Sequence, residues 1–190
     1  MKGRVGASRA VRSLHGVIAP RIRAHLERAR VPFQTHRHPR AVGAQQVASA
    51  LHVTGYQVAK GVLVQVDGRP WIAALRAPER VDPERLARLL SARSVRLLEE
   101  REFAPLFPDC EPGAEPLLGS LYGLRLALDA ELLRGPHLLF HAGSHDEVVE
   151  LRVEDLVALE HPHVGRFGRE PLDAVPRSTP YEESAGATGG

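Results

Sequence analysis

The chain has 190 residues, of which 43% are hydrophobic and 25% charged, and its formal net charge is +2. These values are ordinary for a globular protein and suit one domain with flexible ends. No apolar run approaches the ~18 residues of a membrane-spanning helix. A single cysteine, Cys110, excludes an intramolecular disulfide. We therefore expect a soluble, cytoplasmic protein in a reducing compartment.

Basic residues gather at the N-terminal end. Residues 1–40 carry ten basic side chains and one acid, whereas the rest of the chain carries fifteen basic and twenty-two acidic side chains. This composition suits contact with a polyanion, a solvated basic extension or a transit peptide, and all three interpretations stay open. Arginine outnumbers lysine by twenty-three to two. Of Lys2 and Lys60, only Lys60 falls inside the expected domain, where a compact ammonium with a tunable pKa marks it as a functional candidate.

Helices are predicted from apolar periodicity and capping signals. A first helix follows Pro20 and places Ile22, Leu26 and Ala29 on one face. The other helices are expected at 43–51, at 82–90, in a short acidic stretch that ends near residue 107, and at 154–159.

Two of these helices have specific starts. Gly43 is an acceptable N-cap, and Gln46 three residues later is placed to reach back as in a capping box. Asp82 is a strong N-cap and is followed by Pro83 in the first helical position.

Strands and turns complete the prediction of fold class. Asp67-Gly68 is a strong hairpin signal between two strands. Since strands and helices are interspersed irregularly, we expect an α+β fold with a mixed, mostly antiparallel sheet. A flexible basic extension is expected at 1–17, a folded domain at 18–168 and a disordered tail at 169–190. The predicted strands are 31–35, 58–66, 71–75, 95–98, 124–128, 138–141 and 148–153.

The strand that carries Lys60 is the first segment with a chemical signal. Lys60 lies between Ala59 and Gly61, whose small size leaves room for a ligand beside the lysine stem. The alternative is a lysine on the solvated face of a half-exposed strand. The lysine-poor composition favours the functional interpretation.

The loop over residues 113–119 is the second candidate. Glycine stands at both ends and Pro116 lies inside, so the loop is stiff and suited to presenting backbone groups to a small polar group such as an α-amine. An ordinary surface connection is the alternative.

Other chemistries have little support in the sequence. Closely spaced histidines occur at positions 36, 38, 137, 141, 145, 161 and 163, but none has a known zinc-binding spacing. No nucleophile elbow, dinucleotide fingerprint or Walker loop is present, and Cys110 has no nearby activating signal. We expect no metal and no cofactor.

In order along the chain, the segments resemble YbaK-type domains, which include the editing insertion of bacterial prolyl-tRNA synthetase and its free-standing relatives. The similarity covers residues 20–168. It rests on His38-Pro39-Arg40-Ala41 with Gly43-Ala44-Gln45-Gln46-Val47-Ala48, on Val58-Ala59-Lys60-Gly61-Val62, on Phe107-Pro108-Asp109-Cys110-Glu111-Pro112-Gly113-Ala114-Glu115-Pro116, on Phe140-His141-Ala142-Gly143-Ser144-His145 and on Val153-Glu154-Asp155-Leu156.

The chain departs from the family pattern at several positions. Gly43 and Gln46 replace the usual threonine and glutamate, and both keep helix capping plausible. Gly61 and Gln65 differ from the common lysine strand. Leu117 stands where the family's loop usually has proline, which puts substrate fit in question more than fold.

The resemblance implies a curved, mostly antiparallel sheet surrounded by helices, and hydrolysis of the ester that joins an amino acid to the 3′ end of tRNA. It implies Lys60 as the catalytic residue, which neutralises the phosphate or ribose end, while the 113–119 loop holds the α-amino group with backbone carbonyls. The substrate's own hydroxyl would assist the attacking water. The implied substrate-binding residues are His38, Gly113, Ala114, Glu115, Pro116, Gly119, Gly143 and His145.

The expected function is therefore trans-editing of tRNA mischarged with a small amino acid, and alanine, serine, cysteine and proline stay open. The expected partners are the acceptor end of that tRNA and an aminoacyl-tRNA synthetase, with no DNA and no membrane. One alternative is a non-catalytic module that binds tRNA or a synthetase with salt-dependent affinity, for which Leu117 and the basic N-terminal forty residues speak. A small-molecule esterase or amidase is a third.

Overall fold

The computed structural model describes residues 18–170, and its helices begin close to the predicted capping signals. Asp82 Oδ1 accepts hydrogen bonds from the backbone N–H groups of Glu84 and Arg85, which caps α3. Gln46 Oε1 accepts one from the N–H of Gly43, the N-cap of α2. The helices are α1 (Pro20–Arg28), α2 (Ala44–Ala50), α3 (Pro83–Leu90), α4 (Glu100–Phe103) and α5 (Val153–Glu160), with 3-10 helices η1 (Ala104–Leu106), η2 (Gly119–Tyr122) and η3 (Ala130–Arg134).

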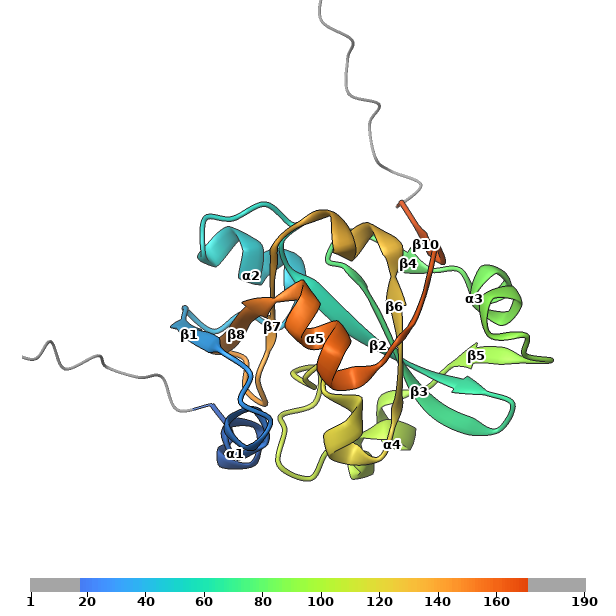
Figure 1. Cartoon of the computed structure of the whole chain (residues 1–190), viewed down its shortest axis with the longest axis horizontal. Coiled ribbons are helices and arrows are strands. Elements are labelled where there is room, and N and C mark those ends of the chain that lie inside the picture. The colour runs from blue at the N-terminus through green and yellow to red at the C-terminus, as the bar shows by residue number, and fades with distance from the viewer. Residues whose placement is uncertain (1–17, 171–190) are drawn as a thin grey trace, which may run out of the picture.

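A five-stranded sheet in the order β5-β2-β3-β6-β9 forms the centre of the described residues (Figure 1). The predicted Asp67-Gly68 turn connects β2 to β3, and these strands pair antiparallel over their full length. β3 pairs parallel with β6, and β6 parallel with β9, so the sheet is mixed. Its strands are β2 (Ala59–Val66), β3 (Arg69–Arg76), β5 (Val95–Leu97), β6 (Arg125–Asp129) and β9 (His163–Gly165).

A second, three-stranded sheet in the order β1-β8-β7 is antiparallel throughout. An isolated parallel bridge joins Val58, just before β2, to Leu139 of β7. The two sheets therefore meet at the beginning of the strand that carries Lys60. The strands of this sheet are β1 (Phe33–Arg37), β7 (His137–His141) and β8 (Glu147–Arg152), and β4 (Arg80–Val81) pairs with β10 (Gly168–Arg169) in a separate ribbon.

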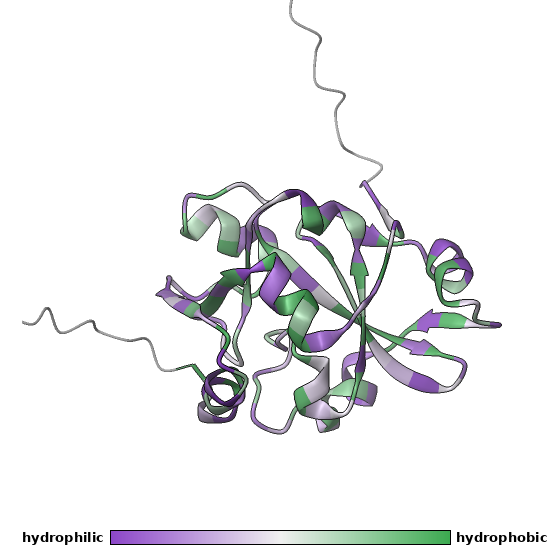
Figure 2. Ribbon diagram, in the orientation of Figure 1, coloured by the Kyte–Doolittle hydropathy of each residue, from purple (hydrophilic) through white to green (hydrophobic). Residues whose placement is uncertain are grey.

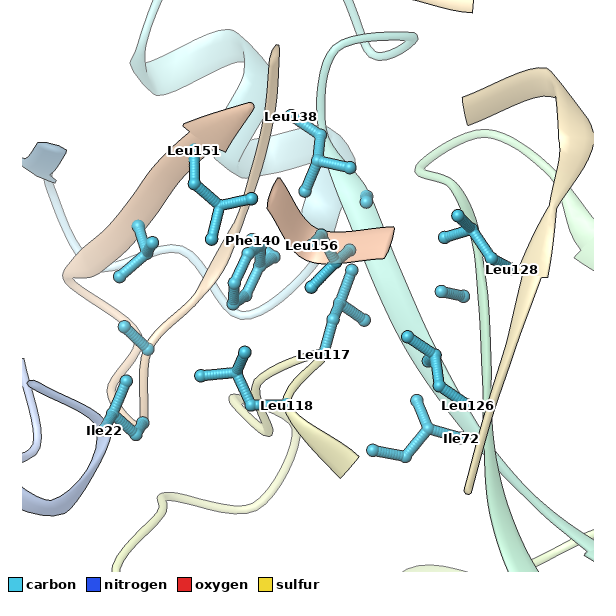
Figure 3. Packing of buried hydrophobic residues seen from close by; sticks show 14 of the residues in the cluster. Ile22, Ile72, Leu117, Leu118, Leu126, Leu128, Leu138, Phe140, Leu151 and Leu156 are labelled. Atoms are coloured by element: carbon cyan, nitrogen blue, oxygen red, sulfur yellow. The ribbon is translucent and has the colours of Figure 1, made fainter. Parts of the chain in front are cut away.

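The main hydrophobic core fills the space between the two sheets. It joins Ile72 of β3 to Phe140 of β7 and Leu156 of α5, and all three side chains are almost completely buried (Figure 3). Helices α1 and α5 carry hydrophobic residues beside hydrophilic ones (Figure 2), as expected for helices that cover a core with one face. α1 contributes Ile22 and Leu26, which were predicted to share that face.

The structure corrects the predicted elements in detail and confirms the α+β class. Ala29, placed on the buried face of the first helix, is exposed because α1 ends at Arg28 and Ala29 is its C-cap. The first strand begins at Phe33 instead of residue 31. The short strands β4, β9 and β10 were not predicted: β4 and β10 have two residues each, and β9 has one apolar residue, Val164, between His163 and Gly165.

The predicted N-terminal extension, 1–17, lies outside the described residues. The predicted C-terminal tail begins too early, because Arg169 is paired in β10, and 171–190 lie outside the described residues. Within 18–170, no helix is long and apolar enough to cross a membrane.

Candidate functional site

Two adjoining cavities meet at Lys60, since Gly43, Ala44 and Lys60 line both. The outer cavity has a volume of about 400 Å³, and its other lining residues are Gln45, Ala77, Pro78 and Arg80. The inner cavity has a volume of about 180 Å³, and its other lining residues are Val42, Ala59, Gly61, Gly113, Glu115 and His141.

Strand β2 places Lys60 between the two cavities. Lys60 is opposite Leu75 in the β2–β3 pair, and its Nζ donates a 2.8 Å hydrogen bond to the backbone oxygen of Ala77. Burial and the neighbouring charge of Arg80 lower the pKa of Lys60, while Glu79 raises it. A partly desolvated ammonium held at a fixed point attracts an anion more strongly than one in open water.

The predicted 113–119 loop reaches the inner cavity through Gly113 and Glu115. Gly113 has a φ of +88°, which glycine adopts at low cost, and its N–H donates a 2.9 Å hydrogen bond to Glu115 Oε1. Glu115 is 8% exposed, and this burial raises the pKa of its carboxyl group. The cavity therefore holds a carboxyl group that is able to accept a hydrogen bond from a substrate ammonium.

The loop is held in place by the turn between β7 and β8. The N–H of Glu111 donates to the backbone oxygen of Gly143 at 2.8 Å, and the N–H of Gly143 donates to Ala114 at 3.0 Å. His145 Nε2 lies 2.9 Å from the backbone oxygen of Pro112. The carbonyl oxygen of Ala114, which the resemblance offered to a substrate amine, therefore already accepts an internal hydrogen bond.

Three buried histidines, His38, His141 and His145, lie behind and beside the inner cavity. Their ring centroids are 6.2 Å apart between His38 and His141 and 5.5 Å apart between His141 and His145. In each ring one nitrogen lies 2.8 to 3.1 Å from a backbone carbonyl oxygen. Within the described residues, no group of three or more histidine, cysteine or acidic side chains is placed to hold a metal ion.

Leu117 and Gly61, two departures from the family pattern, are in contact. A Cβ atom at Gly61 would lie 3.2 Å from Leu117 Cδ2 and 3.1 Å from Ile72 Cγ2. Leu117 is fully buried and its side chain points into the core with Ile72 and Leu126 (Figure 3). The leucine therefore occupies the space next to which a larger side chain at position 61 would have to fit, and it does not line either of the two cavities.

The other predicted site residues lie behind the cavity walls. Ala114 and Pro116 are buried in the loop, and Gly143 connects the loop to the β7–β8 turn. Gly119 begins η2, where an added Cβ would lie 2.8 Å from the backbone oxygen of Leu124, so this glycine permits a close backbone approach. Their roles toward a substrate stay predictions.

Sequence reasoning missed Arg80 and gave His141 no role. Arg80 follows the turn after β3, and only the antiparallel pairing of β3 with β2 brings that turn beside Lys60. His141 is one of the histidines at which no known zinc-binding spacing was found. The orientation of its ring could not be derived from spacing.

Cys110 is unsuited to nucleophilic catalysis. Its Sγ lies 3.3 Å from the Tyr122 hydroxyl, and burial raises the pKa of the thiol to about 11. Little thiolate therefore exists near pH 7, in agreement with the lack of an activating signal in the sequence.

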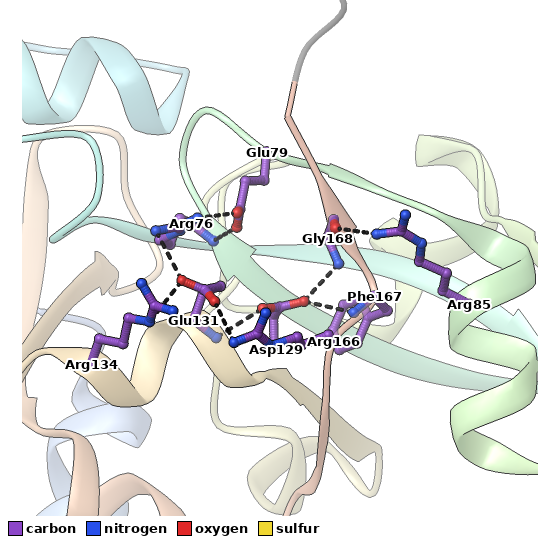
Figure 4. A network of polar contacts seen from close by, with 9 residues as sticks. All are labelled: Arg76, Glu79, Arg85, Asp129, Glu131, Arg134, Arg166, Phe167 and Gly168. Carbon is purple, nitrogen blue, oxygen red and sulfur yellow. Dashed lines mark hydrogen bonds and ion pairs between the residues drawn. The ribbon is translucent and has the colours of Figure 1, made fainter. Parts of the chain in front are cut away.

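A larger cavity of about 620 Å³ lies on the other side of the turn after β3. Its charges are combined in a network in which Glu131 contacts Arg134 at 3.0 Å, Arg166 at 3.3 Å and Arg76 at 3.5 Å (Figure 4). Arg76 also pairs with Glu79. Because three arginines share Glu131 and Arg76 also pairs with Glu79, we assign this cavity a structural role despite its size, although Arg76 Nε has no hydrogen-bond partner among the described residues.

The comparison with protein families decides the identity of the chain. The model of the aminoacyl-tRNA editing domain matches residues 38–159, from His38 through Lys60 and the 113–119 loop into α5. The chain belongs to the aminoacyl-tRNA editing domain family. The two cavities that meet at Lys60 are thus lined entirely by residues of the editing domain.

Solved structures share the fold of this editing domain. A candidate trans-editing enzyme for prolyl tRNA synthetase is 20% identical, with a TM-score of 0.69 over 80% of this chain and 96% of that one. The hypothetical protein APE2540 is 16% identical, with a TM-score of 0.71 over 78% and 99%. A scaffold protein from a study of computational epitope grafting is 22% identical, with a TM-score of 0.70 over 80% and 97%. No curated protein matches the chain by sequence.

Proposed function

We propose that this editing domain is an aminoacyl-tRNA deacylase that hydrolyses the ester of tRNA mischarged with a small amino acid. The observation that carries the proposal is the opposite character of the two cavities that meet at Lys60. Lys60 and Arg80 line the outer cavity, and among the described residues no acidic side chain lines it. Glu115 and His141, which both offer acceptors, line the inner one.

This arrangement orients an aminoacyl ester in one direction. The phosphate and ribose of the terminal nucleotide lie in the outer cavity, where two cations attract them. The α-ammonium group lies in the inner cavity beside Glu115, and the ester bond lies near Lys60 at the junction. A reactive ester held in this way needs positioning and electrostatic stabilisation more than a metal.

The chemical step is hydrolysis of the ester. Water attacks the carbonyl carbon, the bond from that carbon to the ribose oxygen breaks, and a proton passes to the ribose oxygen. The products are a free amino acid and tRNA with its terminal hydroxyl restored. Lys60 stabilises the negative charge that develops at the junction without forming a covalent bond to the substrate.

The size of the inner cavity favours a small amino acid. Its volume of about 180 Å³ is below the roughly 300 Å³ or more of the pockets that hold drug-sized ligands. A pocket of this size admits a small side chain and excludes a larger one, which is how the second sieve of an editing system works.

The test is release of labelled amino acid from a panel of tRNAs mischarged with alanine, serine, cysteine or proline. Wild-type protein is compared with Lys60→Ala, and Arg69→Ala on the exposed β2–β3 hairpin is the matched control. We expect release from one or a few substrates by wild type and by Arg69→Ala, and its loss in Lys60→Ala. Equal release by Lys60→Ala would refute the proposal, and tRNA binding without release from any substrate would favour the non-catalytic module.

A further inference from the structure

His141 lines the inner cavity and has a buried ring nitrogen without a partner in the described part of the chain, as His38 and His145 beside it also have. The residue is 8% exposed and lines the inner cavity, yet its Nε2 is buried and has no hydrogen-bond partner among residues 18–170. A buried polar atom without a partner costs free energy, so such an atom at a cavity calls for a functional explanation.

The other ring nitrogen defines the tautomer. His141 Nδ1 lies 3.1 Å from the backbone oxygen of Ser144, and a carbonyl oxygen only accepts hydrogen bonds. Nδ1 therefore carries the proton, and in the neutral ring Nε2 is an acceptor. Burial is the main cause that lowers the pKa of His141 to about 4, so the ring is neutral near pH 7. His145 and His38 lower this pKa further and Glu111 raises it, so these three groups belong to the same electrostatic environment.

Strand pairing brings His141 to the same cavity as Lys60. Val58 and Leu139 form a parallel bridge, and Lys60 and His141 follow each by two residues, on the same side of their strands. Glu115 enters from the 113–119 loop. The inner cavity is thus lined by two residues that carry acceptor groups, Glu115 and His141, which come from separate parts of the chain.

We propose that His141 Nε2 accepts a hydrogen bond from the α-ammonium group of the bound amino acid and so helps the inner cavity select a free amino group. This inference rests on the proposed function, because it takes the aminoacyl end of tRNA as the ligand. A neutral imidazole and a carboxyl group on two sides of a small cavity suit an ammonium group, which has three N–H donors. N-acylation leaves one N–H donor, or none in proline, and the acylated group carries no charge and is bulkier.

The experiment measures binding rather than turnover. The probes are RNA microhelices that end in CCA and carry alanine, serine, cysteine or proline on the terminal ribose through an amide in place of the ester. Each probe is prepared with a free α-ammonium group and in N-acetylated form. The quantity of interest is the ratio of the two dissociation constants for wild type, His141→Phe and His141→Gln.

We expect wild type to prefer the free ammonium form and His141→Phe to lose at least about tenfold of that preference, because hydrogen bonds to charged groups are the stronger class. His141→Gln keeps an acceptor and should retain part of it. Taking the ratio within each protein cancels any general weakening of RNA binding. Thermal melting of both variants and binding of the bare microhelix show whether the fold and the outer cavity are intact.

An unchanged ratio in both variants would overturn the inference, as would equal loss for free and acetylated probes. Absence of any preference in wild type would overturn it as well. Since the probes are not hydrolysed, these outcomes are independent of the release assay. If mischarged tRNA is hydrolysed but the ratio is unchanged in the variants, the protein is a deacylase in which His141 does not recognise the amino group. If the ratio depends on His141 but no tRNA is hydrolysed, the protein is a binding module that recognises the amino group.

Discussion

The cavity system at Lys60 and the larger cavity at Glu131 are both lined by charged residues, but they satisfy those charges differently. At Glu131 the carboxylate contacts three arginines, and Asp129 accepts the backbone N–H groups of Phe167 and Gly168 at 2.8 and 2.6 Å (Figure 4). At Lys60, Arg80 has no ion-pair partner among residues 18–170, and His141 Nε2 is unpaired.

We use this difference, and not cavity size, to distinguish a structural network from a binding site. Groups that satisfy one another have little capacity left for a ligand and contribute to folding. Groups that are held in place by the fold but left without partners reserve their hydrogen bonds and charge for a ligand. Substitutions in the first region should therefore change stability, and substitutions in the second should change activity.

The largest effect should follow Asp129→Ala, which removes the acceptor that fastens β10. The carboxylate also accepts the N–H of Glu131, so three backbone donors would lose their partner. At about 1 kcal/mol or more for each donor, we expect the free energy of unfolding to fall by about 3 kcal/mol. Urea denaturation measures this change, and kcat/KM for deacylation by the folded protein should stay within about twofold. A large loss of activity with unchanged stability would show that the Glu131 region is not merely structural.

Lys60→Ala should show the reverse pattern. Loss of the ammonium at the junction of the cavities should lower kcat/KM for deacylation by about a hundredfold, or about 2.7 kcal/mol of transition-state stabilisation. The free energy of unfolding should change by less than about 1 kcal/mol, because Lys60 is only half-buried and gives up one hydrogen bond. Lys60→Arg should keep part of the activity if charge is what matters. Activity of Lys60→Arg as low as that of Lys60→Ala would point to a geometric role instead.

Gly61→Ala tests the packing behind the cavity with an effect of intermediate size. The added methyl group would lie 3.2 Å from Leu117 Cδ2 and 3.1 Å from Ile72 Cγ2, so we expect a loss of about 1 kcal/mol in the free energy of unfolding from overpacking. In a Leu117→Ala background, where that space is open, the same substitution should cost less. Additive effects in this double-mutant cycle would show that the two positions are not coupled.

The smallest effect concerns pH. The charge of Arg80 lowers the pKa of Lys60, so Arg80→Ala should raise that pKa and move the alkaline loss of kcat/KM to higher pH. Under the proposed function the activity requires the protonated lysine, which is present below its pKa and lost above it. Arg80→Ala should also reduce the salt dependence of tRNA binding by about one phosphate contact. The exposed Arg69→Ala variant should lose kcat/KM at the same alkaline pH as wild type. A shift of this loss to lower pH in Arg80→Ala would contradict the electrostatic explanation.

Much of the local structure could be predicted from the sequence, because its causes lie within a few residues of one another. Asp82 and Pro83 start α3, and the Asp67-Gly68 turn connects β2 to β3. Both features follow from local backbone preferences and need no distant contact. The importance of Lys60 was inferred from composition, and its resemblance to a family motif agrees with the match to the editing domain.

The tertiary structure alone decided what surrounds Lys60. The parallel bridge between Val58 and Leu139 places His141 at the cavity, although the two strands are about eighty residues apart in sequence. Gly61 and Leu117 depart from the family pattern at positions far apart in sequence, and the fold packs these two positions against each other. Such contacts depend on strand register and on the packing of loops, which propensity and periodicity do not encode. The sequence therefore determined the longer elements and the family of the chain, whereas the register of the sheets decided which side chains share the cavity.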